Sequence, residues 1–165
     1  MREQLTKDDI RKIEEEIAHR KLVVRKEALD AVKEARAHGD LSENFEYHAA
    51  KREKNQNESR IRYLERMVKT ARIIEDHSAP DEIGLNSKVE LYFPDDDETE
   101  TYILVTSILG NSLENRISIE SPLGKAIRGH KVGEVITVRM ENGASYEVEV
   151  RSVTPFEEEI PIRKF

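Results

Sequence analysis

The sequence contains no cysteine and no tryptophan, its aromatic content is only 5%, and it has no long apolar run. Without cysteine, disulfides and thiolate metal sites are excluded, which is compatible with a reducing cytosol, and we expect a cytoplasmic protein. The longest apolar runs, such as residues 103–105, fall far short of the roughly 18 residues of a membrane span. No apolar segment follows the first basic residues, so we expect neither a secretory leader nor a membrane partner.

Proline is absent from the first 75 residues, and these contain a single glycine, Gly39. Because proline costs roughly 3 kcal/mol inside a helix, this composition favours long helices with one interruption. Apolar residues recur at three-, four- and seven-residue steps on both sides of Gly39, which predicts two helices packed antiparallel in a coiled-coil hairpin. The stripes are Ile10, Ile13, Ile17, Val24, Ala28 and Val32, then Ile61, Leu64, Val68 and Ala71.

Aliphatic residues are also absent from residues 51–60, in the middle of the second predicted helix. We therefore expect burial to be concentrated at the open end of the hairpin, where residues 10–17 face residues 61–71. The half nearest Gly39 should be a slender polar projection.

The second half of the chain has the composition of a β-domain. Five segments rich in β-branched or aromatic residues predict strands, and Asn142-Gly143 is a hairpin signal. Ser121, Pro122 and Gly129 have the positions of a cap, a first residue and a terminator of a short helix. The predicted strands are residues 87–93, 100–109, 116–120, 134–140 and 144–153.

Charge divides along the same boundary. Hydrophobic and charged residues each make up 37% of the chain, and the net charge of -7 is distributed as +2 over residues 1–75 and -9 over the remainder. We predict an α+β protein with a helical hairpin over residues 1–75, a linker over 76–85 and an antiparallel β-domain over 86–156. Residues 157–165 are expected to form a solvated acidic tail.

The sequence contains no strong motif for an active site formed by this chain alone. The five histidines show no i, i+4 pair and no His-Glu-x-x-His arrangement, so a zinc site has little support, and each histidine reads as a surface residue. Gly124 and Gly129 have the spacing of a phosphate loop, but His130 and Lys131 follow where Lys-Ser or Lys-Thr is needed. No nucleophile and base can be paired from spacing.

The concentrated polar feature is the reversal itself, where Asp40 and Glu43 lie three residues apart. One interpretation is structural: Gly39 ends the first helix, Asp40 caps the second and Glu43 completes a capping box. The other is that the two carboxylates are presented to Mg²⁺. That ion takes one or two carboxylates while keeping waters and substrate oxygens, so these acids would complete a site supplied by another protein.

The reversal resembles a known motif. Residues 39–50, GDLSENFEYHAA, are similar to the tip of the bacterial transcript-cleavage elongation factors of the Gre family, and more closely to its A-type members. Residues 31–38, 60–74, 117–126 and 129–134 also resemble that family, so the similarity covers nearly the whole chain. The tip residues besides the two acids that we expect to support it are Gly39, Leu41, Ser42, Asn44 and Tyr47.

The resemblance implies a cofactor of bacterial RNA polymerase that is not itself an enzyme. The hairpin would enter the secondary channel of a backtracked complex, where Asp40 and Glu43 would help to hold the second Mg²⁺ and orient the attacking water. The polymerase would then cut the nascent RNA near its 3′ end. The resemblance also implies an FKBP-like β-domain that docks at the channel rim through Ser121 and Pro122. We expect a monomer that binds no cofactor stably by itself and shares Mg²⁺ with the polymerase.

Basic residues flank the reversal. We hypothesise that Arg36, Lys51 and Arg52 meet the phosphates of the backtracked RNA, with a merely solvated charged face as the alternative.

Two departures from the family pattern stand out. Lys26 follows Arg25 where the family commonly has proline, and Phe45 replaces an alanine beside the tip.

Two other functions stay open: a related channel regulator that inhibits instead of stimulating cleavage, and an FKBP-type prolyl isomerase. The scarcity of aromatics argues against the isomerase, whose pocket is lined by aromatic rings.

Overall fold

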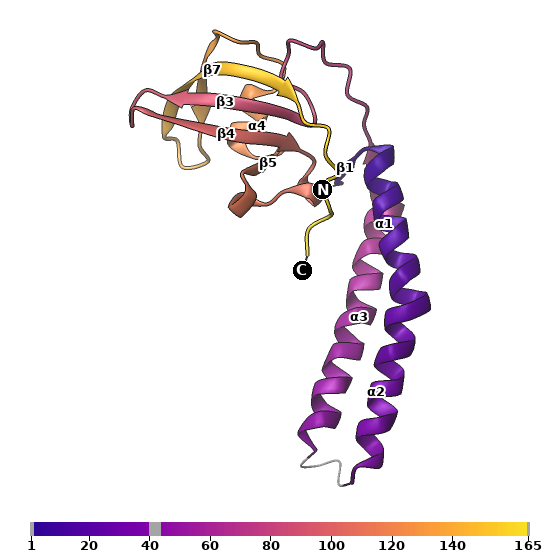
Figure 1. The fold of residues 1–165 in the computed structure, drawn as a ribbon. Coiled ribbons are helices and arrows are strands. Elements are labelled where there is room, and N and C mark those ends of the chain that lie inside the picture. The colour runs from indigo at the N-terminus through magenta and orange to yellow at the C-terminus, as the bar shows by residue number, and fades with distance from the viewer. Residues whose placement is uncertain (1, 40–43, 165) are drawn as a thin grey trace. The chain divides into compact units, whose positions relative to one another are not determined.

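A computed structural model describes residues 2–39 and 44–164 (Figure 1). The chain divides into two compact units. The first, called the arm below, is the helical region Asp8–Arg72 with the residues that precede the first strand. The second, called the body, comprises Gln4–Lys7 and Ile73–Lys164. The predicted α+β class is therefore confirmed, with helices in one unit and the main sheet in the other.

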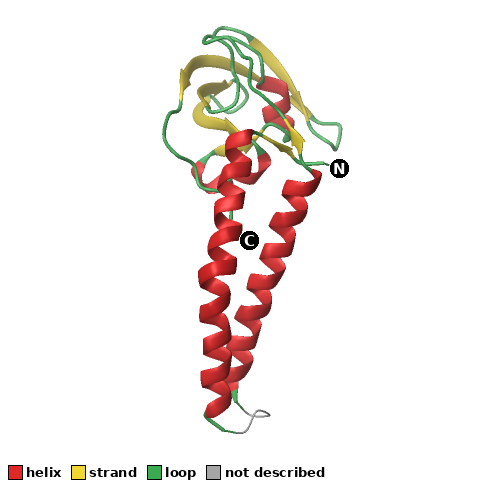
Figure 2. Cartoon of the chain, turned by 90° about the vertical axis from the view of Figure 1, so that its right-hand side faces the viewer, coloured by secondary structure: helices red, strands yellow, loops and turns green. Residues whose placement is uncertain are grey.

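The arm is a hairpin of two helical stretches that run side by side (Figure 2). The first consists of α1 (Lys7–His19), a π-helical segment (Arg20–Val24) and α2 (Arg25–Ala37), and the second is α3 (Phe45–Thr70). The π-helical segment was not predicted, because neither proline nor glycine marks it. It leaves the apolar side chains of Leu22 and Val23 exposed. Such wide turns are often found at functional positions of helices.

The apolar core of the arm is thin and uneven, as the sequence predicted. Ile13, Ile61, Leu64 and Met67 are buried at the open end. Nearer the reversal the buried apolar side chains are only Ala35 and Ala50 among the described residues, and these small side chains let the helices approach closely. The remaining buried positions of α3 are polar, and they are described with the site below.

The body contains a five-stranded sheet in the order β5-β4-β3-β7-β6. Its strands are β3 (Ser87–Phe93), β4 (Glu98–Val105), β5 (Arg116–Ser118), β6 (Val135–Arg139) and β7 (Ser145–Pro155). All neighbours are antiparallel except β4 and β5, which are parallel, so the sheet is mixed and not purely antiparallel as predicted. The predicted strand over 100–109 was too long, since Ser107–Leu109 form a 3₁₀ turn.

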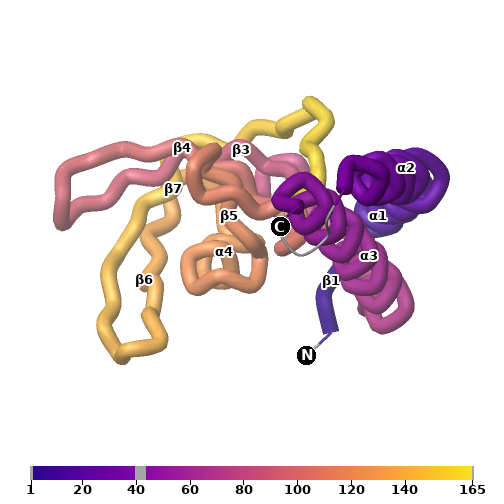
Figure 3. Tube along the Cα trace, turned by 90° about the horizontal axis from the view of Figure 1, so that it is seen from below, coloured from indigo at the N-terminus to yellow at the C-terminus, as the bar shows by residue number. Residues whose placement is uncertain are grey.

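Successive side chains of a strand point to opposite faces of the sheet, so every second residue of these strands lies in the core. Val89 and Leu91 of β3, Val138 of β6, and Val148 and Val150 of β7 are buried together. The short helix α4 (Pro122–Ile127) lies against the same sheet next to β5 and β6, and Ile127 joins the core from it (Figure 3). Ile83, which was assigned to the linker, is also in this core, so residues 76–85 are partly built into the body.

Two further short strands, β1 (Gln4–Leu5) and β2 (Arg72–Ile73), pair with each other. The backbone N–H of Arg72 donates to Glu3 and that of Ile74 donates to Leu5, both at 2.9 Å. No sequence pattern predicted these two strands, because strands of two residues are too short to show alternation.

The segment after β7 corrects another prediction. Residues 157–165 were expected to be solvated, but Ile160 is only 3% exposed and the backbone N–H of Arg163 donates to the carbonyl of Ile108 at 2.7 Å. One apolar residue among the glutamates is therefore enough to fix the segment to the body. No helix in the described ranges is long and apolar enough to cross a membrane.

Gly124 provides a sharp test of the body's packing. A Cβ atom at this position would lie 1.9 Å from the backbone oxygen of Ser118, which no rotamer change relieves. Gly124→Ala should therefore lower the free energy of unfolding of the body by about 2–3 kcal/mol. Urea unfolding followed by tyrosine fluorescence measures this, with Gly129→Ala as a control whose cost comes only from its positive φ. Equal stability of wild type and Gly124→Ala would contradict this packing.

Candidate functional site

The helices of the arm are closed at the reversal by residues whose conformations fit the turn. α2 ends at its C-cap His38, and Gly39 has φ +128°, a backbone conformation that other residues adopt only with strain. The predicted role of Gly39 as helix terminator is thus confirmed.

The cap of α3 is supplied by Asn44 and not by Asp40, so that prediction was wrong. The Asn44 side-chain oxygen accepts a hydrogen bond from the backbone N–H of Tyr47 at 3.0 Å, the geometry of an N-cap. Its side-chain nitrogen donates to the carbonyl of Ala35 at 2.6 Å. One asparagine side chain therefore caps α3 and ties it to the last turn of α2, which supports the expected role of Asn44 at the tip.

Asp40, Leu41, Ser42 and Glu43 lie outside the described residues, so the two predicted metal-binding acids stay predictions. Within residues 2–39 and 44–164, no group of three or more histidine or acidic side chains is arranged to hold a metal ion.

Side chains on either side of the reversal contact one another. The Arg36 guanidinium lies 5.6 Å from the centroid of the Tyr47 ring, a cation–π distance, and His38 contacts the Glu46 carboxylate at 3.1 Å. Both contacts join α2 to the first turn of α3. Phe45 is 86% exposed, so its ring does not pack between the helices.

Lys51 and Arg52 lie on the exposed surface of α3 beside a shallow hollow of about 520 Å³. His48, Asn55, Gln56 and Ser59 complete its lining. The structure therefore brings Lys51 and Arg52 together, whereas Arg36 lies on α2 and is engaged with Tyr47. Among the described residues no carboxylate lines the hollow, and its lining is basic or neutral and polar.

A buried polar layer holds the middle of the arm together. The Glu16 carboxylate accepts from Arg20 Nε at 2.7 Å and from Arg60 Nε at 3.0 Å, so it joins α1 to α3. Arg20 also donates to the Asn57 side-chain oxygen at 3.0 Å, and the Asn57 nitrogen donates back to the Arg20 carbonyl at 3.3 Å. Asn57 and Arg60 are 4% and 3% exposed, so polar side chains occupy the positions where a coiled coil normally buries leucine.

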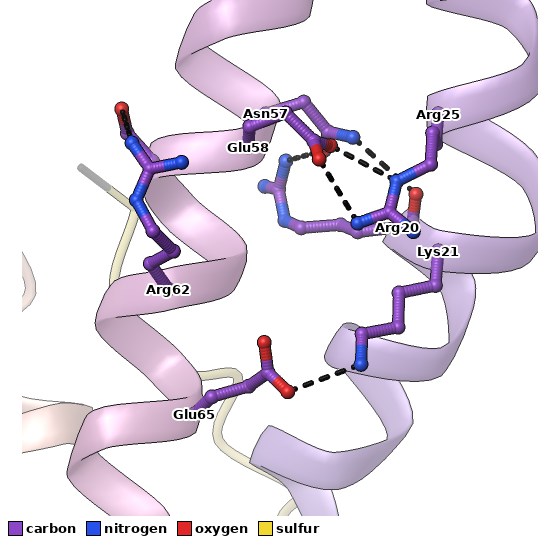
Figure 4. A network of polar contacts seen from close by, with 8 residues as sticks. Arg20, Lys21, Arg25, Asn57, Glu58, Arg62 and Glu65 are labelled. Atoms are coloured by element: carbon purple, nitrogen blue, oxygen red, sulfur yellow. Dashed lines mark hydrogen bonds and ion pairs between the residues drawn. The ribbon is translucent and has the colours of Figure 1, made fainter.

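Ion pairs at the surface continue this layer along the hairpin (Figure 4). Arg25 forms a two-pronged contact with the Glu58 carboxylate, with both distances at 3.0 Å, and Lys21 pairs with Glu65 at 3.0 Å. All these residues fall in or beside the π-helical segment or opposite it on α3. Sequence reasoning missed this network because charged and amide side chains normally indicate a solvated face.

Two family models match this chain, one over each half of its length. A family model described as "Transcription elongation factor, N-terminal" matches residues 3–73, and one described as "Transcription elongation factor, GreA/GreB, C-term" matches residues 77–155. The chain belongs to the GreA/GreB family of transcription elongation factors. The resemblance of the tip motif to that family is therefore confirmed, and it extends over both units.

Individual GreA/GreB relatives match over most of their length. The chain is 43% identical over 140 residues to transcription elongation factor GreA of Geobacillus kaustophilus, covering 84% of this chain and 89% of the relative. It is 35% identical over 151 residues to GreA of Acholeplasma laidlawii, covering 92% and 96%. A solved structure of GreA factor homolog 1 of Thermus thermophilus is 30% identical, covers 93% of this chain and 98% of that one, and superposes with a TM-score of 0.43.

In this GreA/GreB member the predicted docking residues Ser121 and Pro122 begin α4. The Ser121 hydroxyl donates to the Ser118 carbonyl at 2.7 Å and accepts from the Gly124 N–H at 3.1 Å, which confirms it as the N-cap. Ser107, Ser118 and Glu120 hydrogen-bond to one another just before it. The hydroxyl of Ser121 is therefore already used within the body, and Pro122 is displayed on a fixed turn.

The polar layer of the arm predicts a pH dependence. Burial raises the pKa of Glu16, but hydrogen bonds and charge from Arg60 and Arg20 outweigh it and leave the pKa below the ordinary 4.5. Because the folded-state pKa is depressed, the stability that Glu16 contributes is complete above pH 4.5 and is lost as pH falls through the lower folded value. Helix unfolding in urea, followed by circular dichroism at pH 3 to 6, should show wild type and Glu16→Gln converging at the acid end. A constant difference would contradict it.

Proposed function

We propose that this chain binds bacterial RNA polymerase, inserts the arm into the secondary channel and stimulates the polymerase's own Mg²⁺-dependent cleavage of backtracked RNA. The observation that carries the proposal is the tip motif at residues 39–50, with both Asp40 and Glu43 present in a chain of the GreA/GreB family. The chain acts on the polymerase and is not itself the nuclease.

The donor set of the tip suits a shared metal. Two carboxylates are the ligands that Mg²⁺ prefers, and they are too few to hold it without waters and further acids. When bound between the factor and the polymerase, Mg²⁺ would supply charge neutralisation and an activated water for phosphodiester hydrolysis. In this proposal Asp40 and Glu43 ligate at the shared position and orient the attacking water toward the phosphorus.

The described part of the arm has the properties that delivery of such a tip requires. The 26 residues of α3 extend about 39 Å at 1.5 Å per residue. The helices are held by hydrogen bonds and ion pairs across their interface, so the arm needs few bulky side chains near the reversal and stays narrow there. Asn44, the residue that follows Glu43 in the sequence, fixes the start of α3 through its cap hydrogen bond.

The body is proposed to dock at the channel rim, with Pro122 as a contact. Its turn is held by the Ser121 and Ser118 hydrogen bonds, so little conformational entropy is lost when a partner packs against it.

The test is transcript cleavage in stalled, backtracked complexes assembled with polymerase from a GreA-containing bacterium and Mg²⁺. The initial rate of 3′-fragment release should rise well above that of polymerase alone when the intact chain is added. A chain that binds polymerase and lowers both cleavage and elongation would instead be an inhibitory channel regulator. A chain that binds no polymerase would rule out both functions.

The basic side chains near the tip are proposed to contact the phosphates of the extruded RNA. The combined change Arg36→Ala, Lys51→Ala and Arg52→Ala should lower crosslinking to the RNA and reduce the log-log salt slope of crosslinking by roughly 2. A matched control, Arg62→Ala with Arg66→Ala and Lys69→Ala, removes the same charge from the other end of α3 and should change neither. Salt-dependent crosslinking that survives the first triple change would contradict the RNA contact.

A further inference from the structure

The body contains a cavity of about 570 Å³ between the 3₁₀ region and the segment after β7. One wall runs from Leu109 to Arg116, and the other is formed by residues 161–164. The second wall is anchored by the buried Ile160 and by the hydrogen bond from Arg163 N–H to Ile108. Because the family model ends at residue 155, the second wall of this cavity is built from residues beyond the matched region.

The charged residues that line the cavity are basic in the part of the chain that the structure describes. Arg116, Arg163 and Lys164 line it and no described carboxylate does, although residues 76–165 carry a net charge of -9. Arg116 is the most informative of the three, since its Nε atom is buried and has no hydrogen-bond partner among the described residues. A buried donor without a partner costs about 1–3 kcal/mol. A ligand carboxylate in the cavity would pair with the guanidinium group of Arg116, because carboxylates pair well with guanidinium groups.

The remaining lining is aliphatic. Leu109, Pro161 and Ile162 line the cavity together with Leu113, whose side chain is 94% exposed. Inorganic phosphate would use the cations but leave this apolar surface in water. Single-stranded nucleic acid normally stacks its bases on aromatic rings, and none of the lining residues within 44–164 is aromatic. Carboxylates combined with an aliphatic side chain match both halves of the lining.

We propose that this cavity binds an acidic peptide segment of a protein partner, with its carboxylates on Arg116 and the basic residues of the terminal segment and one bulky apolar side chain against Leu109 and Leu113. The size of the cavity is within the range of sites that bury a ligand of a few residues. This inference does not depend on the proposed action of the tip, because the acids at the tip and the cavity in the body share no residue.

The experiment is an amide NMR titration of the intact chain with the peptide acetyl-Glu-Asp-Leu-Asp-Glu-amide. Saturable shifts are expected for amides of residues 109–116 and 161–164. Arg116→Gln should weaken binding about tenfold, whereas Arg139→Gln, which removes an exposed charge from β6, should leave it unchanged. Leu113→Ser tests the apolar half with a fully accessible residue, so the proposal stays testable even if Arg116→Gln perturbs the fold.

Several outcomes would overturn the proposal. The first is an absence of saturable shifts up to about 10 mM peptide, ten times a weak millimolar dissociation constant. The second is equal binding of a peptide with serine in place of leucine. The third is an equal loss of affinity in Arg116→Gln and Arg139→Gln. Stronger shifts of the same amides with inorganic phosphate or an RNA oligonucleotide would assign the cavity to another ligand, and shifts on raising the protein concentration alone would assign it to a second copy of the chain.

Discussion

Replacing either acid of the tip should abolish most of the stimulation of cleavage. Asp40→Ala and Glu43→Ala are each expected to lower the rate of 3′-fragment release by about 100-fold or more relative to the intact chain. The reason is that each removes a carboxylate that, in the proposed function, completes a metal site and orients water, and no other described group of the arm is arranged as a metal site. The measurement is the initial cleavage rate at saturating factor.

A matched control separates chemistry from charge. Glu53→Ala removes one exposed carboxylate from α3 without touching the tip, and it should retain the full cleavage rate. All three variants should compete equally with the intact chain for polymerase, since neither acid is proposed to contribute to docking. If Asp40→Ala and Glu43→Ala bind polymerase and cleave at the normal rate, the proposed roles of both acids are wrong.

Removing Glu16 should be the most damaging single change to the arm outside its apolar core. Glu16→Ala is expected to lower the free energy of unfolding of the arm by about 2–3 kcal/mol. Arg60 would keep its charge while 3% exposed, and Arg20 would lose the same partner. Urea unfolding followed by circular dichroism measures the change, because most of the helix is in the arm.

Two further variants test whether burial of the Glu16–Arg60 pair is the reason for this loss of stability. Glu65→Ala breaks an interhelical pair whose side chains are 40% and 47% exposed, so it should cost no more than about 0.5 kcal/mol. Replacing both members of the buried pair, Glu16→Leu with Arg60→Met, should restore most of the stability lost in Glu16→Ala, because the buried guanidinium of Arg60 is removed together with its carboxylate partner and Arg20 keeps its hydrogen bond to Asn57. If Glu16→Ala and Glu65→Ala cost the same, burial of the pair is not what makes Glu16 important.

The sequence predictions that succeeded were based on the spacing of apolar residues and on the residues typical of turns and helix caps. The first and fifth predicted strands start at or within one residue of β3 and β7, because one face of each is buried and the alternation is strict. Ser121 was recognised as a cap because its hydroxyl, the following proline and the later glycine all favour the same helix start. The apolar stripe of the arm likewise predicted which end is better packed.

The failures have two physical causes: side chains whose role depends on a partner distant in sequence, and local patterns that fit two structures equally well. Asn57 and Arg60 read as exposed because their partners Arg20 and Glu16 lie 37 and 44 residues away. Asp40 and Asn44 are both good caps, and only the observed start of α3 at Phe45 decides between them. The run 106–109 looked like strand because buried 3₁₀ turns and buried strands are equally apolar.

Placement of the tip is the central claim, and photocrosslinking from position 45 tests it most directly. Phe45 is exposed and directly follows the tip, so p-benzoylphenylalanine in its place is a small change. The same group in place of Tyr63 on α3 serves as the control. The proposal predicts that position 45 crosslinks to the 3′ segment of the RNA in backtracked complexes, and that position 63 does not. Crosslinks from position 45 only to the outer surface of the polymerase, with equal yield whether or not the complex is backtracked, would contradict it.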